Sequence, residues 1–560
     1  MKTMKNGAKP MPNSQKSSES IEQNYPSWRK SHFSAAAGQS LKSHSGKNNL
    51  FSIYIHTGTS DEPSTDHERL TATIESLHQQ TYRNIEARIC GKALSNVSFS
   101  KLLHQWKEDF QCLRGIEVSS NDYGPTAKCG TRGLLDWRGD YLLWIEEGTI
   151  LEKNAMESLN TVINVHQGTK PPEIIVIDHE YWDPAVASSL RPYFFPGWDP
   201  DLMTQAPSLG KACAISRVLL TTYSELSRFA NDPHSTTMDE WIALLSKHYP
   251  WPESAHLSSP VMRFCNQGLP LHSFPAPSEL EPAGGLSIII PNKNNPHLLR
   301  NCVHFLENHN DSNIELIIVD NGSTDADIPA LYEDLKKRHG AMIISMPGLF
   351  NYSKLINAGA QHATCEYLLL LNNDVIIPEI EKIWSLADLA SQPGVGVVGS
   401  ILMYPNRRIQ HAGILLTQGY CASHVMRNAE EEDVGPGNIL RTLRNYQAVT
   451  GALQIMKTSI FKEVNGYDEI HLPVEFNDVD FCLRVREKGH KILCAPMLGI
   501  IHAESSTRQE ISPIETVKDQ RESKSYMMKR WQRAFNRDPF SNPNLLITDR
   551  SEPGLTPINS

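Results

Sequence analysis

The chain has 560 residues, of which 40% are hydrophobic, and it carries a formal net charge of −10 at pH 7 with a pI of about 6.1. This length suffices for two or three domains with separate cores. The acidic balance argues against a nucleic-acid-binding protein, which is usually basic. The ten cysteines are scattered without a CxxC pair, so we expect neither structural zinc nor a disulfide scaffold, and a reducing compartment fits.

The N-terminal region is basic and has little apolar character. Residues 1–48 hold eight Lys or Arg against two Glu, which predicts a disordered basic tail that is either solvated or weakly attracted to anionic lipid heads. The N-terminus has no signal-peptide core, and no apolar run approaches the ~18 residues that cross a bilayer. We expect a cytoplasmic protein and leave open a peripheral association with the inner face of the cell membrane.

From Phe51 the sequence alternates between strand and helix patterns. Apolar runs predict strands, and the amphipathic stretch 67–80 predicts a helix. The predicted strands are 51–56, 84–90, 140–148 and 173–178. Residues 274–285 contain three prolines and two glycines, which predicts a linker that closes a first domain at 49–273.

After the linker the same kind of pattern begins again, which predicts a second domain at 286–510 and a C-terminal helix and tail at 511–560. Apolar runs that alternate with helical stretches indicate an α/β fold with a mostly parallel sheet covered on both faces. The predicted strands are 286–291, 314–320, 341–346, 366–374 and 491–496, and the helices are 297–309, 326–340 and 352–363. A faint similarity between 73–91 and 302–320 indicates one architecture used twice.

Three strands of the second domain end in polar side chains. Ligands of open parallel sheets bind at the carboxyl ends of the strands, so these residues predict a polar cleft, although each alone could be turn chemistry. They are Pro291, Asn292, Asp320, Asn321, Asn372, Asn373 and Asp374. The phosphate loop GxxxxGK[ST] and the dinucleotide motif GxGxxG are both absent, which argues against those two kinds of site.

Two further stretches carry ionisable residues whose roles stay open at this point. Asp478 and Asp480 open a predicted helix, where they either complement the helix dipole or supply a general base. His502 follows an apolar run and is either a core histidine or a metal ligand. Near the C-terminus, the basic amphipathic stretch 524–535 packs on the body or lies on a membrane.

The second domain resembles family 2 glycosyltransferases, which have the GT-A fold, and within them the bacterial branch of O-antigen and surface-polysaccharide enzymes. The resemblance covers about residues 286–546 and rests on an ordered set of motifs. These are SIIIPNKN, IIVDNGSTD, LFNYSKLINAGA, LLLLNNDVIIP, VGVVGSILMYPNRRIQHAGILL, AVTGALQIMKTSIFKEVNGYDE, FNDVDFCLRVREKGHKI, IIHAESSTR and RWQRAFNRDPFSNPNL. Enzymes of this family are inverting, use a nucleotide-diphospho-sugar and need a divalent cation.

The resemblance implies a role for each strand-end residue. Asp320 matches the carboxylate that faces the nucleotide base, and Pro291 and Asn292 match the loop under the base. Asn321 is a further expected nucleotide-sugar-binding residue. The Asn372-Asn373-Asp374 run occupies the DxD position of the family, with Asn372 near the ribose. Asp374 matches the metal-binding carboxylate, and His502 matches the metal-ligand or phosphate-contacting histidine near the end of the fold, with Mn²⁺ or Mg²⁺ as the expected ion. Asp478 matches the catalytic base. Asp480 remains an acceptor-binding acid or a reserve base.

The first domain is also similar to a GT-A domain, but it departs from the pattern at the DxD position. That position reads Glu146-Glu147-Gly148, so the expected metal carboxylate falls on Gly148. We hypothesise that this domain is catalytically inactive and acts as a scaffold or as a binding site for acceptor glycan.

The sequence therefore predicts two tandem GT-A-like domains, with the chemistry in the second. The expected partners are a nucleotide-diphospho-sugar donor and a glycan or lipid-linked acceptor in surface-polysaccharide biosynthesis, with no nucleic acid. A non-catalytic glycan- or nucleotide-binding scaffold is the alternative. A nucleotidyltransferase would carry a Gly-rich phosphate loop after its first strand, and 291–298 has no glycine.

Overall fold

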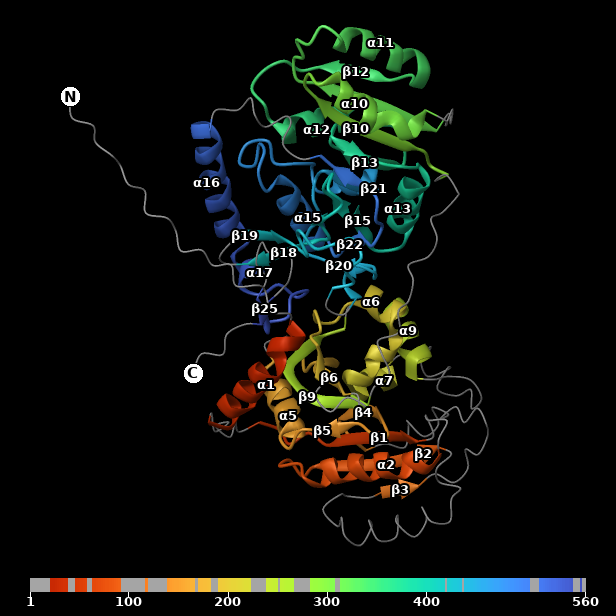
Figure 1. Ribbon diagram of the computed structural model, residues 1–560, viewed down its shortest axis with the longest axis vertical. Helices are drawn as coiled ribbons and strands as arrows, with labels where there is room; N and C mark the ends of the chain where they lie inside the picture. The colour runs from red at the N-terminus through yellow and green to blue at the C-terminus, as the bar shows by residue number, and fades with distance from the viewer. Residues whose placement is uncertain are drawn as a thin grey trace, which may run out of the picture.

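The computed structural model describes residues 21–38, 46–57, 63–91, 116–118, 138–166, 170–182, 190–222, 238–249, 252–265, 283–307, 313–417, 421–435, 438–503, 513–546 and 554–555. Two α/β halves lie one above the other along the long axis, the first from red to yellow-green and the second from green to blue (Figure 1). None of the helices in the described residues combines the length and the apolar character that crossing a bilayer requires.

The first half contains a mixed sheet of nine strands, in the order β3-β2-β1-β4-β8-β6-β9-β5, with β7 paired to β6. Its strands are β1 (Phe51–Thr57), β2 (Ile85–Gly91), β3 (Ile116–Val118), β4 (Tyr141–Glu146), β5 (Ile150–Leu151), β6 (Ile174–Trp182), β7 (Leu190–Tyr193), β8 (Cys213–Ser216) and β9 (Ser254–Cys265). Its helices include α1 (Ile21–Gly38), α2 (Pro63–His78), α5 (Ala155–Val165), α6 (Pro200–Gln205), the 3₁₀ helix η2 (Pro207–Ala212), α7 (Arg217–Thr222) and α9 (Met238–His248).

The second half contains a mixed sheet of eight strands, in the order β12-β11-β10-β13-β21-β15-β22-β20. These strands are β10 (Leu286–Asn292), β11 (Ile314–Asp320), β12 (Met342–Ser345), β13 (Tyr367–Leu371), β15 (Val395–Ser400), β20 (Arg444–Asn445), β21 (Leu453–Lys457) and β22 (Lys491–Ala495). A smaller sheet, β14-β23-β16-β17, lies beyond their ends and consists of β14 (Val375–Ile376), β16 (Leu402–Met403), β17 (Ile409–His411) and β23 (Ile501–His502). Hairpins β18 (Ile414–Thr417) with β19 (Cys421–His424) and β24 (Leu545–Leu546) with β25 (Gly554–Leu555) complete the strands.

Helices cover both faces of the second sheet, as predicted. Alternate residues of the strands point to opposite faces. Accordingly, Ile288 and Ile290 belong to one buried cluster, while Ile289 belongs to another. The first cluster includes residues of α10 (Pro296–Val303), α11 (Ile328–His339) and α13 (Glu381–Ser391). The second includes residues of α12 (Tyr352–Ala360), α14 (Thr458–Glu463), α15 (Asn477–Glu487), α16 (Pro513–Arg530) and α17 (Gln532–Asn536).

The two large sheets share the order and the direction of seven strands. In each sheet three parallel pairings lead to the fourth strand, which is followed by two antiparallel pairings and one parallel pairing. The equivalent runs are β3-β2-β1-β4-β8-β6-β9 and β12-β11-β10-β13-β21-β15-β22. This recurrence supports the prediction of one architecture used twice.

Two sequence-based expectations about the architecture need correction. The sheets are mixed rather than mostly parallel, because β21 runs antiparallel between β13 and β15 and β8 does so between β4 and β6. The expected disorder of 1–48 is wrong for 21–38, which form α1. Tyr25 and Trp28 of α1 are buried, and Arg29 forms an ion pair with Glu180 at 2.7 Å. The expected linker lies largely outside the described residues.

Polar contacts join the two halves. Asp199, at the N-terminus of α6, accepts hydrogen bonds from the backbone and the side-chain amide of Asn445 at 3.0 and 2.6 Å. Asp201 forms an ion pair with Lys491 at 3.0 Å. From the C-terminal segment, the Asn542 amide donates to the fully buried Asp178 of the first half at 2.8 Å. The C-terminal segment therefore ties the second half back onto the first.

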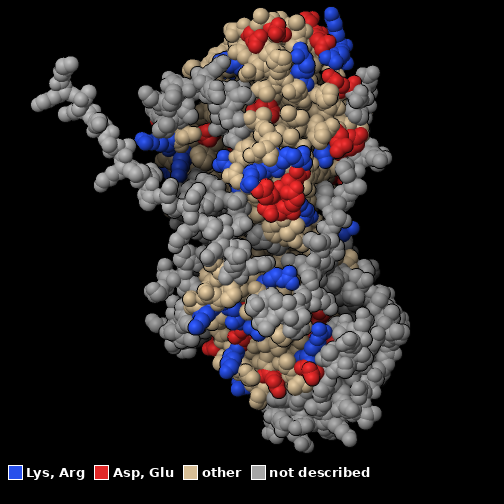
Figure 2. Space-filling model, viewed as in Figure 1, with Lys and Arg blue, Asp and Glu red and all other residues tan. Residues whose placement is uncertain are grey.

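Helix α16 packs on the body of the second half, one of the two placements that the sequence left open. Its Met527 is fully buried and the adjoining Trp531 is 8% exposed. On the face drawn in Figure 2, acidic and basic side chains of the described residues are interspersed.

Candidate functional site

Asp320 ends β11 and is held by several donors. Its carboxylate accepts hydrogen bonds from the backbone N–H of Gly322 and of Ser323, both at 3.1 Å, and from the Ser323 hydroxyl. The phenol of Tyr332 donates to it at 2.7 Å. Asp320 is 8% exposed, so this carboxylate has a fixed orientation at the end of the strand.

A chain of hydrogen bonds connects Asp320 with the end of β13. The Asn373 amide donates to Asn292 Oδ1 at 2.8 Å, and the Asn292 amide donates to the Tyr332 hydroxyl at 2.9 Å. Burial and the bond to Asp320 raise the pKa of Tyr332, which keeps its hydroxyl proton in place. The chain thus crosses the ends of β11, β10 and β13, which are neighbours in the sheet.

The remaining predicted residues of this region contact the same turn. Pro291 pairs with Val319 in the register of β10 and β11. The backbone N–H of Asn321 donates to the Asn292 carbonyl at 2.8 Å, and its side-chain amide donates to the Met346 carbonyl at 2.9 Å. Asn321 Oδ1 is buried without a hydrogen-bond partner among the described residues.

Asp374 and His502 face one another at the end of β13. Residue 502 pairs with Val375 in the small sheet, and the Ala503 N–H donates to the Asp374 carbonyl at 3.0 Å. His502 Nε2 lies 3.2 Å from Asp374 Oδ1. Among the described residues, Asp374 Oδ1 and Asn372 Oδ1 are buried and receive no hydrogen bond.

The residues at this position fit a divalent cation. A buried carboxylate oxygen without a donor is unfavourable unless another positive group compensates it. The 3.2 Å separation resembles the spacing of about 3 Å between neighbouring ligands that octahedral bond lengths of 2.0–2.1 Å imply. The described residues contain no cluster of three or more His, Cys, Asp and Glu for a metal, so two protein ligands suit an ion that takes further ligands from phosphates and water.

Asp478 lies in the first turn of α15 and is partly exposed. Its carboxylate accepts hydrogen bonds from the backbone N–H of Gly451 and of Val479, both at 2.8 Å. Burial raises the pKa of Asp478, and these two backbone bonds oppose the rise. A carboxylate of raised pKa with access to solvent is suited to proton abstraction.

Two consecutive backbone residues connect Asp478 with Asn372 at the DxD position. Gly451 donates to Asp478, and the carbonyl of the next residue, Ala452, accepts from the Asn372 N–H at 3.0 Å. The Tyr352 phenol donates to the Gly451 carbonyl at 2.8 Å. Burial raises the pKa of Tyr352, and the nearby charges of Asp478 and Asp374 raise it further. The predicted base and the predicted metal ligand therefore lie at one rim of the sheet.

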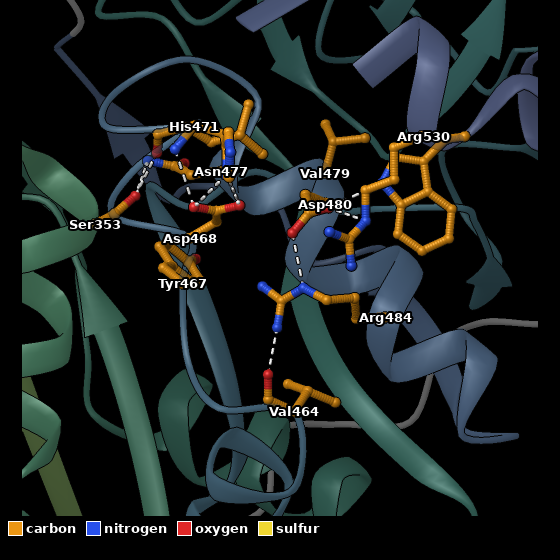
Figure 3. A network of polar contacts seen from close by, with 12 residues as sticks. Ser353, Val464, Tyr467, Asp468, His471, Asn477, Val479, Asp480, Arg484 and Arg530 are labelled. Atoms are coloured by element: carbon orange, nitrogen blue, oxygen red, sulfur yellow. Dashed lines mark hydrogen bonds and ion pairs between the residues drawn. The ribbon is translucent and has the colours of Figure 1, made fainter. Parts of the chain in front are cut away.

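Asp480, the predicted reserve base, lies away from that rim. It is fully buried and forms an ion pair with Arg484 at 2.7 Å (Figure 3). The indole N–H of Trp531 donates to its other oxygen at 2.8 Å, and Arg530 lies 3.3 Å from the same oxygen. These contacts engage both carboxylate oxygens, which argues against a role in proton abstraction.

The matching register of the first sheet shows which residues stand at equivalent positions. Asp320 pairs with Asn292 in the second sheet, whereas Gly91 pairs with Thr57 in the first. Tyr367 begins β13 and pairs with the first residue of β10, and Asp374 lies seven residues further along the chain. Tyr141 begins β4 and pairs with the first residue of β1, and Gly148 lies seven residues further along.

The residues around Gly148 also differ from those at the equivalent positions around Asp374. In the second half, Ile376 pairs with Ile501, and His502 follows Ile501. In the first half, Ile150 pairs with Arg263, and Phe264 follows Arg263, so a phenylalanine stands at the position of His502. At the position of Asn372, Glu146 forms an ion pair with Lys211 at 2.5 Å. In this register, Gly148 of the first sheet stands at the position that corresponds to Asp374 of the second.

Sequence reasoning missed three residues that the structure adds to the site. Tyr332 joins Asp320 to Asn292, Tyr352 holds the Gly451 carbonyl, and Gln410 Oε1 lies 2.8 Å from His502 Nδ1. Tyr352 and Gln410 lay within motifs that carried the resemblance, but their local patterns indicated no contact with the site. Tyr332 stands on the predicted helix 326–340 with no distinguishing signal.

Comparisons with known proteins match part of the chain to a family and most of it to two relatives. Residues 287–431 match the family model for Glycosyl transferase family 2. An uncharacterized protein, y4gI, of Sinorhizobium fredii is 29% identical over 85% of this chain and 56% of its own length. The O-antigen biosynthesis protein RfbC of Myxococcus xanthus is 25% identical over 86% of this chain and 39% of its own length. The chain therefore spans less than two thirds of either relative.

Solved structures match with low similarity. A mannosyltransferase of Pyrobaculum calidifontis, in complex with GDP-Man and Mn²⁺, is 14% identical over 45% of this chain and 72% of that chain, with a TM-score of 0.30. GalNAc-T7 with UDP, GalNAc and Mn²⁺ is 14% identical over 50% of this chain and 51% of that chain, with a TM-score of 0.35. Scores of this size do not establish a common fold. Residues 287–431, which include the strand-end residues Asp320 and Asp374, are therefore similar to a Glycosyl transferase family 2 domain.

Proposed function

We propose that the protein is an inverting, metal-dependent glycosyltransferase that moves a sugar from a nucleotide-diphospho-sugar to a glycan or lipid-linked acceptor in surface-polysaccharide biosynthesis. The observation that carries the proposal is the pair of Asp374, which lies in the segment that matches the family 2 model, and His502, whose Nε2 lies 3.2 Å from Asp374 Oδ1. The likeness to an O-antigen biosynthesis protein supports the polysaccharide setting.

The donor would bind along the ends of β10, β11 and β13. Asp320 is oriented by four donors and could accept hydrogen bonds from the nucleotide base. Asn292 and Asn373 fix the rim between Asp320 and the metal position, and Asn321 Oδ1 and Asn372 Oδ1 remain as acceptors for the donor. This placement would put the nucleotide at β11 and its diphosphate at Asp374.

Asp374 and His502 would hold Mn²⁺ or Mg²⁺, and His502 favours Mn²⁺ because imidazole is a softer ligand than carboxylate or water. When bound, the ion neutralises the charge that develops on the nucleotide-diphosphate leaving group. Both ligands are supplied by the ends of neighbouring strands of the small sheet, so their positions are fixed by the backbone register.

Asp478 would act as the general base. Its carboxylate would accept the proton of the acceptor hydroxyl while the acceptor oxygen attacks the anomeric carbon and the bond to the diphosphate breaks. This single displacement inverts the anomeric centre and needs no covalent bond to the protein. The hydrogen bonds from Gly451 and Val479 orient the carboxylate, and general-base help contributes about 10²–10⁴-fold.

The first half would be a GT-A-like domain that has lost its donor site. Its sheet repeats the strand order of the second half, but glycines stand where the second half has Asp320 and Asp374. The Lys211 ammonium neutralises Glu146 at the position of Asn372, so a metal ion would meet a paired carboxylate there. This domain would act as a scaffold or bind acceptor glycan.

Nucleotide release tests the proposal. The full chain is incubated with UDP-, GDP- and dTDP-sugars, Mn²⁺ or Mg²⁺, and oligosaccharide or lipid-linked acceptors. We expect release with one donor class, abolished in Asp374→Ala and in Asp478→Ala, and metal-dependent nucleotide binding lost only in Asp374→Ala. Asp334→Asn is the matched control, because this exposed carboxylate pairs with Arg338 on α11 of the same half. Absence of release with every donor would favour the alternative of a non-catalytic binding scaffold.

A further inference from the structure

Gln410 stands at an irregularity in the small sheet beside the candidate metal position. Leu402 pairs with His411 and Met403 pairs with Ile409, so Gln410 is the extra residue of a β-bulge between β16 and β17. A bulge bends the strand and turns the side chain of the extra residue out of the regular alternation. Here the 5%-exposed Gln410 side chain reaches His502, which is 92 residues further along the chain.

The surroundings of Gln410 fix which end of its amide faces the imidazole. Gln410 Oε1 lies 2.8 Å from His502 Nδ1, and Gln410 Nε2 lies 3.5 Å from the His502 carbonyl oxygen. A carbonyl oxygen only accepts hydrogen bonds, so the NH₂ end must face it, and the oxygen end must face the ring. His502 Nδ1 therefore carries a proton and donates a hydrogen bond to Gln410 Oε1.

This bond determines the state of the other ring nitrogen. A neutral imidazole with its proton on Nδ1 has a lone pair on Nε2. That lone pair faces Asp374 Oδ1 at 3.2 Å, and the Asn372 amide nitrogen approaches Nε2 at 3.5 Å. Gln410 thus holds the ring in the tautomer and the orientation that a metal ligand needs.

The neighbouring His411 keeps the bulge in place. This fully buried ring receives hydrogen bonds at Nε2 from the N–H groups of Gly413 and Thr450, at 3.3 and 3.4 Å. Its Nδ1 therefore carries the proton and donates to His424 Nδ1 at 2.9 Å. Because His411 is fixed at both nitrogens, the backbone of Gln410 has a defined position before any ligand binds.

We propose that Gln410 is a positioning residue that presents His502 Nε2 to a divalent cation shared with Asp374. The inference rests on the proposed function, because it assigns Gln410 a part in the metal site of that function. Partners that orient a metal-bound histidine typically contribute 10–100-fold to metal affinity, which sets the expected size of the effect at about that range.

Titration of Mn²⁺ followed by electron paramagnetic resonance tests this role in the full chain, with the metal alone and with uridine or guanosine diphosphate. We expect Gln410→Met, which has similar volume and no oxygen, to weaken Mn²⁺ binding by about 10–100-fold. Gln410→Glu keeps an acceptor for His502 Nδ1 and should stay within about threefold of the unaltered chain, because carboxylates are common acceptors for metal-bound histidines. If Gln410→Met does not fold, Gln410→Asn replaces it, since the shorter amide does not reach the ring.

A buried glutamine of the first half provides the matched control. The Gln80 amide donates to the carbonyls of Ser76 and Glu152, and its oxygen accepts from the Met156 N–H. Gln80→Met should lower thermal stability and leave Mn²⁺ affinity unchanged. Unaltered affinity in Gln410→Met, or equal loss in the Met and Glu variants, would overturn the positioning role alone. Absence of Mn²⁺ binding to the unaltered chain under every condition would overturn the proposed function with it.

Discussion

Two carboxylates of one helix, Asp478 and Asp480, should respond in opposite ways to the same substitution. Asp478 is partly exposed, and among the described residues its carboxylate accepts hydrogen bonds from backbone N–H groups alone. Asp480 is fully buried between Arg484, Arg530 and Trp531. We therefore expect Asp478→Asn to abolish sugar transfer with little loss of stability, and Asp480→Asn to lower stability with residual transfer at low temperature.

The magnitude for Asp480 follows from its contacts. Asparagine removes the negative charge opposite the Arg484 guanidinium, whose side chain is only 14% exposed. Breaking a buried ion pair by changing one partner costs about 3–5 kcal/mol. For an unfolding unit of 150–250 residues, each kcal/mol lowers the melting temperature by about 2–4 °C, so the expected drop is roughly 6–20 °C.

The assay pairs thermal unfolding by circular dichroism with nucleotide release measured at least 15 °C below the lower melting temperature, a margin of roughly the size of the expected drop. The base Asp478 contributes about 10²–10⁴-fold, so its variant should fall by that factor at an unchanged melting temperature. An Asp480→Asn protein that melts like the unaltered chain but transfers no sugar would refute the reasoning, since it would assign proton abstraction to the buried residue.

Three more variants probe other contacts. Tyr332→Phe removes the hydroxyl between Asn292 and Asp320. A hydrogen bond to a charged group contributes about 1.5–3 kcal/mol, so we expect calorimetry to show nucleotide binding weakened by roughly 10- to 150-fold. Asn542→Ala should separate the calorimetric unfolding of the two halves, because its amide donates to Asp178 across them, and a single unshifted transition would contradict this. Burial raises the pKa of Asp538 to about 7. The stability that this shift contributes is fully present below about pH 4 and is lost as the pH rises through 7, by up to about 4 kcal/mol. Between pH 5 and 8, Asp538→Asn should therefore lose less thermal stability than the unaltered chain.

Strand and helix positions were predictable because their signals are local. The apolar run that ends at Leu371 is a buried strand, and the polar residues after it lie at the sheet edge as predicted. Strand direction was not predictable, since a strand buried on both faces is equally apolar whether its neighbours are parallel or antiparallel. The mixed sheets arise from β8 and β21, which insert antiparallel beside strands from earlier in the chain.

Contacts between distant residues account for the other differences. The composition of 1–48 predicts disorder, but α1 forms where Tyr25 and Arg29 meet Glu180, more than 150 residues away. Gln410 illustrates the same limit at the site. A bulge decides which way its side chain points, and the motif around it gives no sign of the bulge.

The two halves together show how sheets with the same strand order can carry different residues after their strands. The residues that differ, such as Asp374 and Gly148, follow the strands, whereas the strands themselves are buried in both halves. A strand-end carboxylate without a donor is itself unfavourable, so its replacement by glycine removes a cost in free energy and leaves the core intact. We therefore expect Asp374 to lower the stability of the metal-free second half. It follows that Asp374→Asn should not destabilise the metal-free protein, whereas Mn²⁺ with a nucleoside diphosphate should raise the melting temperature of the unaltered chain and not of this variant.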